Sequence, residues 1–129
     1  MTQQSPAALQ TALAYHHAWT SGDFDQAMTH VADDVVCLAP AGRLAGSAAF
    51  RAFMGPFAGM LTRSELLAAY GDDSTAVLVY DTDTRLVSGA AGAECLQVAD
   101  GKIAHMRIIF DRLPFEHARR QSAPVESTT

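Results

Sequence analysis

Glu94 is the residue of this sequence best suited to chemistry, because it lies in a segment where every second side chain should be buried. In the segment 93–98, the alternation of a β-strand puts Glu94 on the same face as Leu96 and Val98. If that face is the core, burial favours the protonated carboxyl, which can donate a hydrogen bond to a developing oxyanion. If that face is half-exposed, Glu94 is an ordinary surface charge. Alternation alone leaves both interpretations open.

Two further carboxylates, Asp81 and Asp83, share one face of a predicted strand with Val77 and Val79. If this face lines the interior of the domain, the two aspartates lie close together near its mouth. They could not both ionise easily, and one would acquire a pKa useful for proton transfer. The alternative is that residues 81–85 form a solvated edge of the sheet.

Tyr15 is the remaining candidate, on a predicted helix face beside Trp19. Its phenol could donate to a ligand oxygen, or it could be a packed core aromatic whose hydroxyl is satisfied locally. His16 and His17 are adjacent, so they diverge by about 100° on a helix and cannot chelate one metal ion. The sequence therefore predicts no metal site.

The elements that must position these residues follow from hydrophobic periodicity. Helices are predicted from residue 6 to about 20, at 24–31 and from residue 47, and strands at 35–39, 61–70, 75–86, 92–99 and 103–111. The turn at 40–46 is expected to be a loop. In the last strand, Met106, Ile108 and Phe110 share the face that meets the helices. The pattern predicts an α+β domain whose strongly twisted, mixed or antiparallel sheet wraps around three N-terminal helices.

Composition limits the classes of partner. The 129 residues suffice for one domain, expected over 1–115, followed by a polar and disordered tail over 116–129. The net charge of −5, with 9 lysines and arginines, argues against nucleic acid and anionic membranes. The first residues lack the features of a signal peptide, and no apolar run approaches membrane-spanning length, so a cytoplasmic protein is expected. Cys37 and Cys95 are expected to be buried free thiols.

Five short segments carry a resemblance to a known family. They are Ser-Gly-Asp-Phe at 21–24, Ala-Asp-Asp-Val at 32–35, Gly-Arg-Leu-Ala-Gly at 42–46, Asp-Gly-Lys-Ile at 100–103 and Phe-Asp at 110–111. Over residues 6 to about 115, the chain resembles the nuclear transport factor 2 family, above all its ketosteroid isomerases, limonene epoxide hydrolases and SnoaL-like polyketide cyclases. The resemblance implies a cone-shaped sheet around a hydrophobic pocket, and a homodimer through the outer sheet face.

The isomerase pattern transfers to this chain in part. It assigns an oxyanion-hole tyrosine to Tyr15 and an oxyanion-hole acid to Glu94, and it places Met106 and Phe110 in the pocket. The position of the isomerase base, however, is occupied by Ala39. The resemblance therefore implies a hydrogen-bonding site without the proton-shuttling aspartate of that family.

The hydrolase and cyclase patterns transfer less well. The water-activating residues of the epoxide hydrolases would fall near Cys37, Ala39 and Ile108, and their Arg-x-Asp pair falls on Asp81 and Asp83. The acid that the cyclases place on the last strand falls on Ile108.

Two hypotheses follow. The first is an enzyme without cofactor or metal that acts on a hydrophobic steroid, terpenoid or polyketide by isomerisation, cyclisation, dehydration or epoxide opening. The second is a ligand-binding or dimerisation module without turnover. In either case, the predicted ligand-contacting residues are Trp19, Cys37, Phe53, Met54, Met106, Ile108 and Phe110. The predicted dimer face bears His105, Arg107 and Ile109, because no helix is left to cover it.

Overall fold

The order of helices and strands matches an α+β domain. The structure, a computed structural model, describes residues 6–122. Its elements are α1 (Ala7–Thr20), α2 (Phe24–Met28), β1 (Val31–Ala39), β2 (Gly42–Ala45), α3 (Ser47–Gly59), β3 (Leu61–Gly71), β4 (Thr75–Thr84), β5 (Ala90–Ala99), β6 (Lys102–Phe110) and α4 (Leu113–Ser122).

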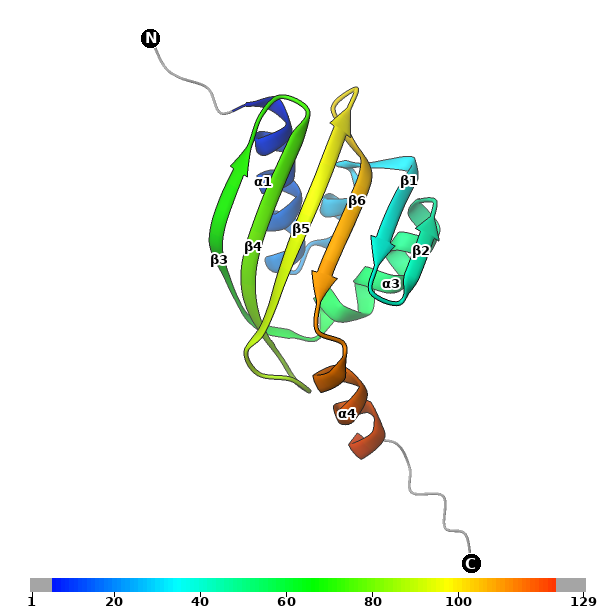
Figure 1. Ribbon diagram of the computed structural model, residues 1–129, viewed down its shortest axis with the longest axis vertical. Helices are drawn as coiled ribbons and strands as arrows, with labels where there is room; N and C mark the ends of the chain where they lie inside the picture. The colour runs from blue at the N-terminus through cyan, green and yellow to red at the C-terminus, as the bar shows by residue number, and fades with distance from the viewer. Residues whose placement is uncertain (1–5, 123–129) are drawn as a thin grey trace, which may run out of the picture.

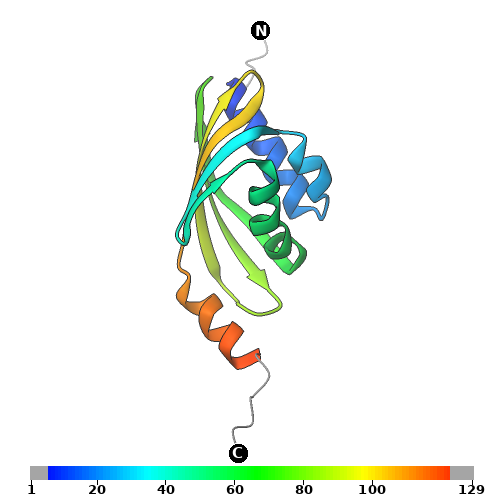
Figure 2. The same cartoon turned by 90° about the vertical axis from the view of Figure 1, so that its right-hand side faces the viewer.

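One open sheet of six strands organises the fold, in the order β2-β1-β6-β5-β4-β3. Strands β3 to β6 form an antiparallel meander, whereas β1 pairs in parallel with β6 and antiparallel with β2. The sheet curves, and α1, α2 and α3 lie against its concave face (Figures 1 and 2). Figure 2 shows that none of the helices of residues 6–122 lies against the convex face. The predicted fold class is therefore confirmed.

Burial follows the predicted alternation along β6. Met106 and Ile108 face the helices and are 2% and 4% exposed, whereas Ile109 on the outer face is 59% exposed. Register shifts in β3, and between Gln97 and Val98 of β5, mark bulges that add to the twist and curvature of the sheet. The curvature lets a single layer of helices fill the concave side.

The C-terminal segment differs from the prediction. Residues 116–122 were expected to belong to a disordered tail, but they continue α4, while residues 123–129 lie outside the described part of the chain. The Asp111 carboxylate accepts from the Leu113 amide at 3.0 Å at the start of this helix. The Phe115 ring lies 6.0 Å from that of Phe57 and 5.7 Å from that of Phe110. Because Phe115 is the one aromatic residue in a mostly polar segment, the hydrophobic periodicity is too weak to predict this helix.

Two shorter elements also differ. Residues 42–45, expected to be a loop, form the edge strand β2, and β1 begins at Val31 rather than Val35. The added residues Asp33 and Asp34 are exposed, so the hydrophobic pattern could not reveal them. Within residues 6–122, the longest helix has 14 residues, and none has the length and apolarity of a membrane span.

Candidate functional site

Glu94 lies on the buried face of β5, where it is 1% exposed. Its neighbours across the sheet are Leu78 of β4 and Ile108 of β6. Burial costs the carboxylate its hydration and raises the pKa of Glu94 to about 7, against a smaller opposing effect of a hydrogen bond from Tyr80. Glu94 therefore changes its charge near neutral pH.

Tyr80 is the partner of Glu94, and the sequence analysis did not identify it. Its hydroxyl donates a short hydrogen bond to Oε2 of Glu94. Tyr80 is 3% exposed and lies on the same face of β4 as Ala76, Leu78 and Thr82, all buried. The interior interpretation of Asp81 and Asp83 required the face of Val77 and Val79 to line the interior of the domain, but the buried face of β4 is the opposite one.

Gly92 makes room for the Tyr80 ring. The two residues are opposite each other on β5 and β4. A Cβ atom at position 92 would lie 2.8 Å from Cε2 of Tyr80 and 3.1 Å from its hydroxyl oxygen. Such distances are shorter than van der Waals contact allows, so the ring can lie over the strand and reach Glu94 only because residue 92 has no side chain. A glycine among alternating residues of a strand was the signal for this close approach.

Tyr15 of α1 and Cys37 of β1 belong to the same buried group, and both are fully buried. Burial, and secondarily the charge of Glu94, raise the pKa of Tyr15 well above its ordinary value and that of Cys37 to about 12. Burial and Glu94 also raise the pKa of Tyr80. Glu94 is therefore the member of this group that titrates near pH 7.

Some polar atoms in this interior have no hydrogen-bond partner among the described residues. They include the Tyr15 hydroxyl and Oε1 of Glu94. Nδ1 of His16 and Nε1 of Trp19 are unpartnered as well. Buried polar atoms are normally satisfied by protein, water or ligand, so these four atoms are exceptions within the described residues.

His16 and Trp19 of α1 pack around Tyr80. The His16 ring centroid lies 5.1 Å from that of Tyr80 and 5.0 Å from that of Trp19, and the Trp19 and Tyr80 centroids are 5.5 Å apart. Burial, and secondarily His17, lower the pKa of His16 to about 4, so its imidazole is neutral at pH 7. No group of three or more metal-ligating side chains occurs among residues 6–122.

A pocket of about 80 Å³ opens beside Tyr80, at the end of the sheet where α4 begins. Its walls come from α3, β4, β5, β6 and α4. They consist of Phe53, Met54, Phe57, Tyr80, Thr82, Ala90, Ala91, Gly92, Ile108, Phe110 and Phe115. Tyr80 thus forms part of the wall, and its hydroxyl is bonded to the buried Glu94.

The predicted ligand-contacting residues divide into two groups. Those that line this pocket are Phe53, Met54, Ile108 and Phe110. The other three, Trp19, Cys37 and Met106, are buried in the hydrophobic core and do not line it. Cys37 and Met106 pair with each other across β1 and β6, and Trp19 packs against Tyr80 and Phe57. Sequence periodicity predicted that these side chains are buried, but it could not predict whether a buried side chain lines the pocket or lies deeper in the core.

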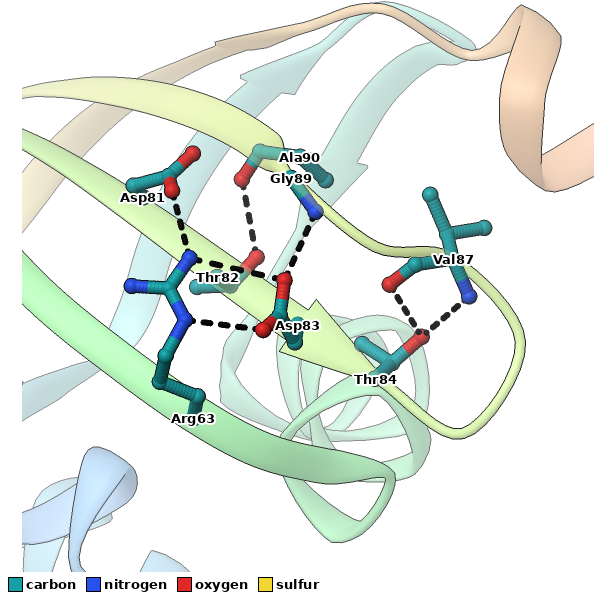
Figure 3. A network of polar contacts seen from close by, with 8 residues as sticks. All are labelled: Arg63, Asp81, Thr82, Asp83, Thr84, Val87, Gly89 and Ala90. Carbon is teal, nitrogen blue, oxygen red and sulfur yellow. Dashed lines mark hydrogen bonds and ion pairs between the residues drawn. The ribbon is translucent and has the colours of Figure 1, made fainter.

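Asp81 and Asp83 lie on the outer face of β4, so they do not form an acid/base pair in the interior. Both are bound by Arg63 of β3 (Figure 3): its Nη2 lies 2.5 Å from Oδ2 of Asp81, and its Nε lies 2.8 Å from Oδ2 of Asp83. Hydrogen bonds from Arg63 and from the Gly89 amide lower the pKa of Asp83. The expected proximity of the two aspartates is found, but an arginine neutralises them outside the cone.

The same polar network fixes one wall of the pocket. Oδ1 of Asp83 accepts from the Gly89 amide at 2.7 Å, immediately before β5 (Figure 3). On the inner side, the Thr82 hydroxyl donates to the Ala90 carbonyl at 2.9 Å. The Thr84 hydroxyl accepts from the Val87 amide at 3.0 Å. These bonds hold together the β4–β5 connection, which leads directly into residues 90–92 of β5 that line the pocket.

Comparison with solved structures places this architecture among known proteins. A protein from Kribbella flavida is 60% identical, over 91% of this chain and 97% of its own, with a TM-score of 0.87. A nuclear transport factor 2-like protein from Cytophaga hutchinsonii is 19% identical over 90% of this chain and 99% of its own, with a TM-score of 0.71. A protein from Sinorhizobium meliloti, proposed to be a polyketide cyclase, is 20% identical over 78% of this chain and 94% of its own, with a TM-score of 0.67.

These distant likenesses establish the fold, which this chain shares with the nuclear transport factor 2-like protein. Comparison with curated proteins gives no match. At the level of sequence, the model of the SnoaL-like domain matches residues 12–106, which run from within α1 to within β6. This chain belongs to the SnoaL-like domain family.

Proposed function

We propose that this protein binds a hydrophobic small molecule beside Tyr80 and acts on it by acid–base chemistry without a cofactor. The observation that carries this proposal is the hydrogen bond between Tyr80, which lines the pocket, and Glu94, a buried carboxyl whose pKa is about 7. A general acid or base works best when its pKa lies near the working pH. Glu94 meets this condition, and Tyr80 connects it to the pocket.

Proton transfer in this arrangement would run through the phenol. When Glu94 is ionised, a proton leaving the substrate binds to the Tyr80 oxygen while the original Tyr80 proton moves to Oε2 of Glu94. Delivery of a proton to the substrate is the reverse. Isomerisation, cyclisation, dehydration and epoxide opening all use such steps.

The second candidate is a binding module without turnover. One observation favours it: Ile108 lines the pocket, and Ala39 occupies the position of the isomerase base, so the acids implied by the family resemblance are absent from β6 and β1. Under this proposal, Glu94 and Tyr80 would only recognise the ligand.

Hydrogen–deuterium exchange at carbon tests the choice between the two. A panel of single-ring ketones, with and without a hydroxyl group, is incubated with the protein in deuterated water, and loss of the α-hydrogen signals is followed by NMR. An enzyme should accelerate exchange of at least one ketone, and Tyr80→Phe and Glu94→Gln should each lower the rate by about 100-fold or more. Binding of ketones without accelerated exchange would favour the binding module.

Matched controls are available on the surface. Tyr70→Phe and Glu65→Gln make the same chemical changes on the outer face of β3, away from the pocket. Tyr70 belongs to the dimer face proposed below, where Tyr70→Phe keeps the ring. Both should exchange the ketone as fast as the unaltered protein. A loss of rate in these controls would show that the effect at positions 80 and 94 is not specific to the site.

We also propose that two copies of the chain pair through the convex face of the sheet. The register places Tyr70, Val77, Cys95 and Arg107 side by side on this face, and Ile109 lies two residues beyond Arg107 on β6. Tyr70 and Ile109 are 74% and 59% exposed. Within residues 6–122, no helix lies against the largely apolar stripe that these residues form (Figure 2). A second copy would supply the same stripe, as a twofold interface requires.

A further inference from the structure

We infer that the pocket selects a neutral, single-ring hydroxy compound whose hydroxyl donates a hydrogen bond to Tyr80. This inference rests on the proposed function and adds to it the class of ligand. It follows from the direction of the hydrogen bonds at the pocket wall, the charge of the lining and the size of the cavity.

The hydroxyl groups of the wall have both used their protons. Of the lining residues, Tyr80 and Thr82 are those with side-chain hydroxyls. Tyr80 donates to Glu94, and Thr82 donates to the Ala90 carbonyl at 2.9 Å. A hydroxyl has one proton to donate and two lone pairs that accept. Toward a ligand, these two groups therefore act as acceptors, and the complementary ligand group is a donor.

Glu94 fixes the direction of the Tyr80 proton. The groups around the pair are the Tyr15 phenol and His16 imidazole of α1 and the Cys37 thiol of β1, all neutral at pH 7. None of them is hydrogen-bonded to Tyr80 within the described residues. At pH 8, where Glu94 is mostly ionised, its carboxylate can only accept, so the Tyr80 proton stays on the Glu94 side.

The lining excludes charged and large ligands. None of the lining residues is charged, and the rings of Phe53, Phe57, Phe110 and Phe115 dominate the wall. A carboxylate or ammonium would be buried without a partner, at high cost. By the same measure of volume, one water needs roughly 10–15 Å³. The cavity of about 80 Å³ therefore matches a single ring better than a fused ring system.

Three fluorinated benzenes test the inference by fluorine NMR titration at pH 8. The first, 4-fluorophenol, can donate; 4-fluorotoluene has the same size and no polar group; 4-fluorobenzaldehyde can only accept. We expect 4-fluorophenol to bind about tenfold more tightly than either of the others, on the scale of one hydrogen bond. Tyr80→Phe, which keeps the ring, should abolish this preference. Tyr70→Phe, on the exposed outer face, should keep it.

A second variant tests the role of Glu94. In Glu94→Leu the Tyr80 proton has no acceptor on that side and can turn toward the pocket, so 4-fluorobenzaldehyde should gain several-fold on 4-fluorotoluene. If this variant fails to fold, the comparison of Tyr80→Phe with Tyr70→Phe still decides the matter. Equal binding of all three compounds to the unaltered protein would overturn the inference and leave the proposed binding site in place. Binding of none would overturn both.

Discussion

Glu94 and His16 have opposite pKa shifts within one interior. Burial raises the pKa of Glu94 from 4.5 to about 7 and lowers that of His16 from 6.5 to about 4. The protonated form of Glu94 favours folding, so its contribution is fully present below pH 4.5 and is lost as the pH rises to 7. The contribution of neutral His16 is fully present above pH 6.5 and is lost as the pH falls to 4. Between pH 4.5 and 6.5 the two slopes largely cancel.

Removing the charge of residue 94 should expose this balance. Each pKa unit corresponds to about 1.4 kcal/mol, so the free energy of unfolding of the unaltered protein, minus that of Glu94→Gln, should fall by about 3 kcal/mol between pH 4.5 and 7. Urea unfolding at a series of pH values measures this difference. The other titrating groups contribute equally to the free energies of unfolding of the two proteins, so their contributions cancel in the difference. Glu65→Gln, on the surface, should give a difference that does not depend on pH. A flat difference for Glu94→Gln would mean that the carboxyl is not buried.

At the scale of single residues, the sequence could identify Glu94 but not its partner. A carboxyl in the pattern of Leu96 and Val98 stands out in any strand with a buried face. Tyr80 does not, because a tyrosine is common on either face of a strand. For Asp81 and Asp83, alternation shows that the two carboxylates share a face of the strand but not whether that face is buried or exposed. The second point decides whether they meet in a pocket or on the surface.

Among the elements, the β4–β5 connection is held from both faces of the sheet. Asp83 joins Arg63 and the Gly89 amide on the outer face, and Thr82 bonds Ala90 on the inner face. Because residues 90–92 line the pocket, the outer ion pairs act on the ligand site indirectly, by positioning its wall.

Loss of the Asp83 carboxylate should loosen this wall without unfolding the domain. Exposed ion pairs contribute about 0.2–1 kcal/mol each, so Asp83→Ala should accelerate amide exchange at Gly89 several-fold while leaving the amides of α1 unchanged. Asp25→Ala is the matched control, because it breaks an exposed ion pair with Arg51 at 2.8 Å, away from the pocket. Hydrogen exchange followed by NMR measures both. Equal acceleration at Gly89 in the two variants would contradict the positioning role.

The elements were predictable where turn signals are strong. The turn between β3 and β4 follows Gly71 and Asp72, and the turn between β5 and β6 follows Asp100-Gly101, which favour tight turns. Between β4 and β5, where the signal is weaker, β4 ends at Thr84 rather than at 86 and β5 begins at Ala90 rather than at 92. Asp100 and Gly101 indeed have positive φ angles of 53° and 78°. By contrast, β2 has four residues and exposed edges, and α4 has a polar sequence, so neither shows the periodicity that identifies an element.

For the whole molecule, the uncovered convex face leads to a prediction about assembly. If two copies pair through the stripe that includes Ile109, then Ile109→Asp should place two unpartnered carboxylates in the interface and give a monomer. Light scattering at micromolar concentration measures the change. Leu86→Asp alters an exposed leucine between β4 and β5, outside the stripe, and should remain a dimer. A monomeric unaltered protein would exclude this interface as a stable one.

The parallel pairing of β1 with β6 has a consequence for how the chain folds during synthesis. Val36 and Cys37, from the first third of the sequence, pair with His105 and Met106, near its end. The sheet edge beyond β6 cannot form until the ribosome has released almost all of the domain, and until then β1 and β2 have no partner in the meander. Contacts this distant in sequence slow folding, because a long loop must close before they form. Nascent chains that stop before Lys102 should therefore remain sensitive to protease, and protection should arise abruptly once β6 emerges.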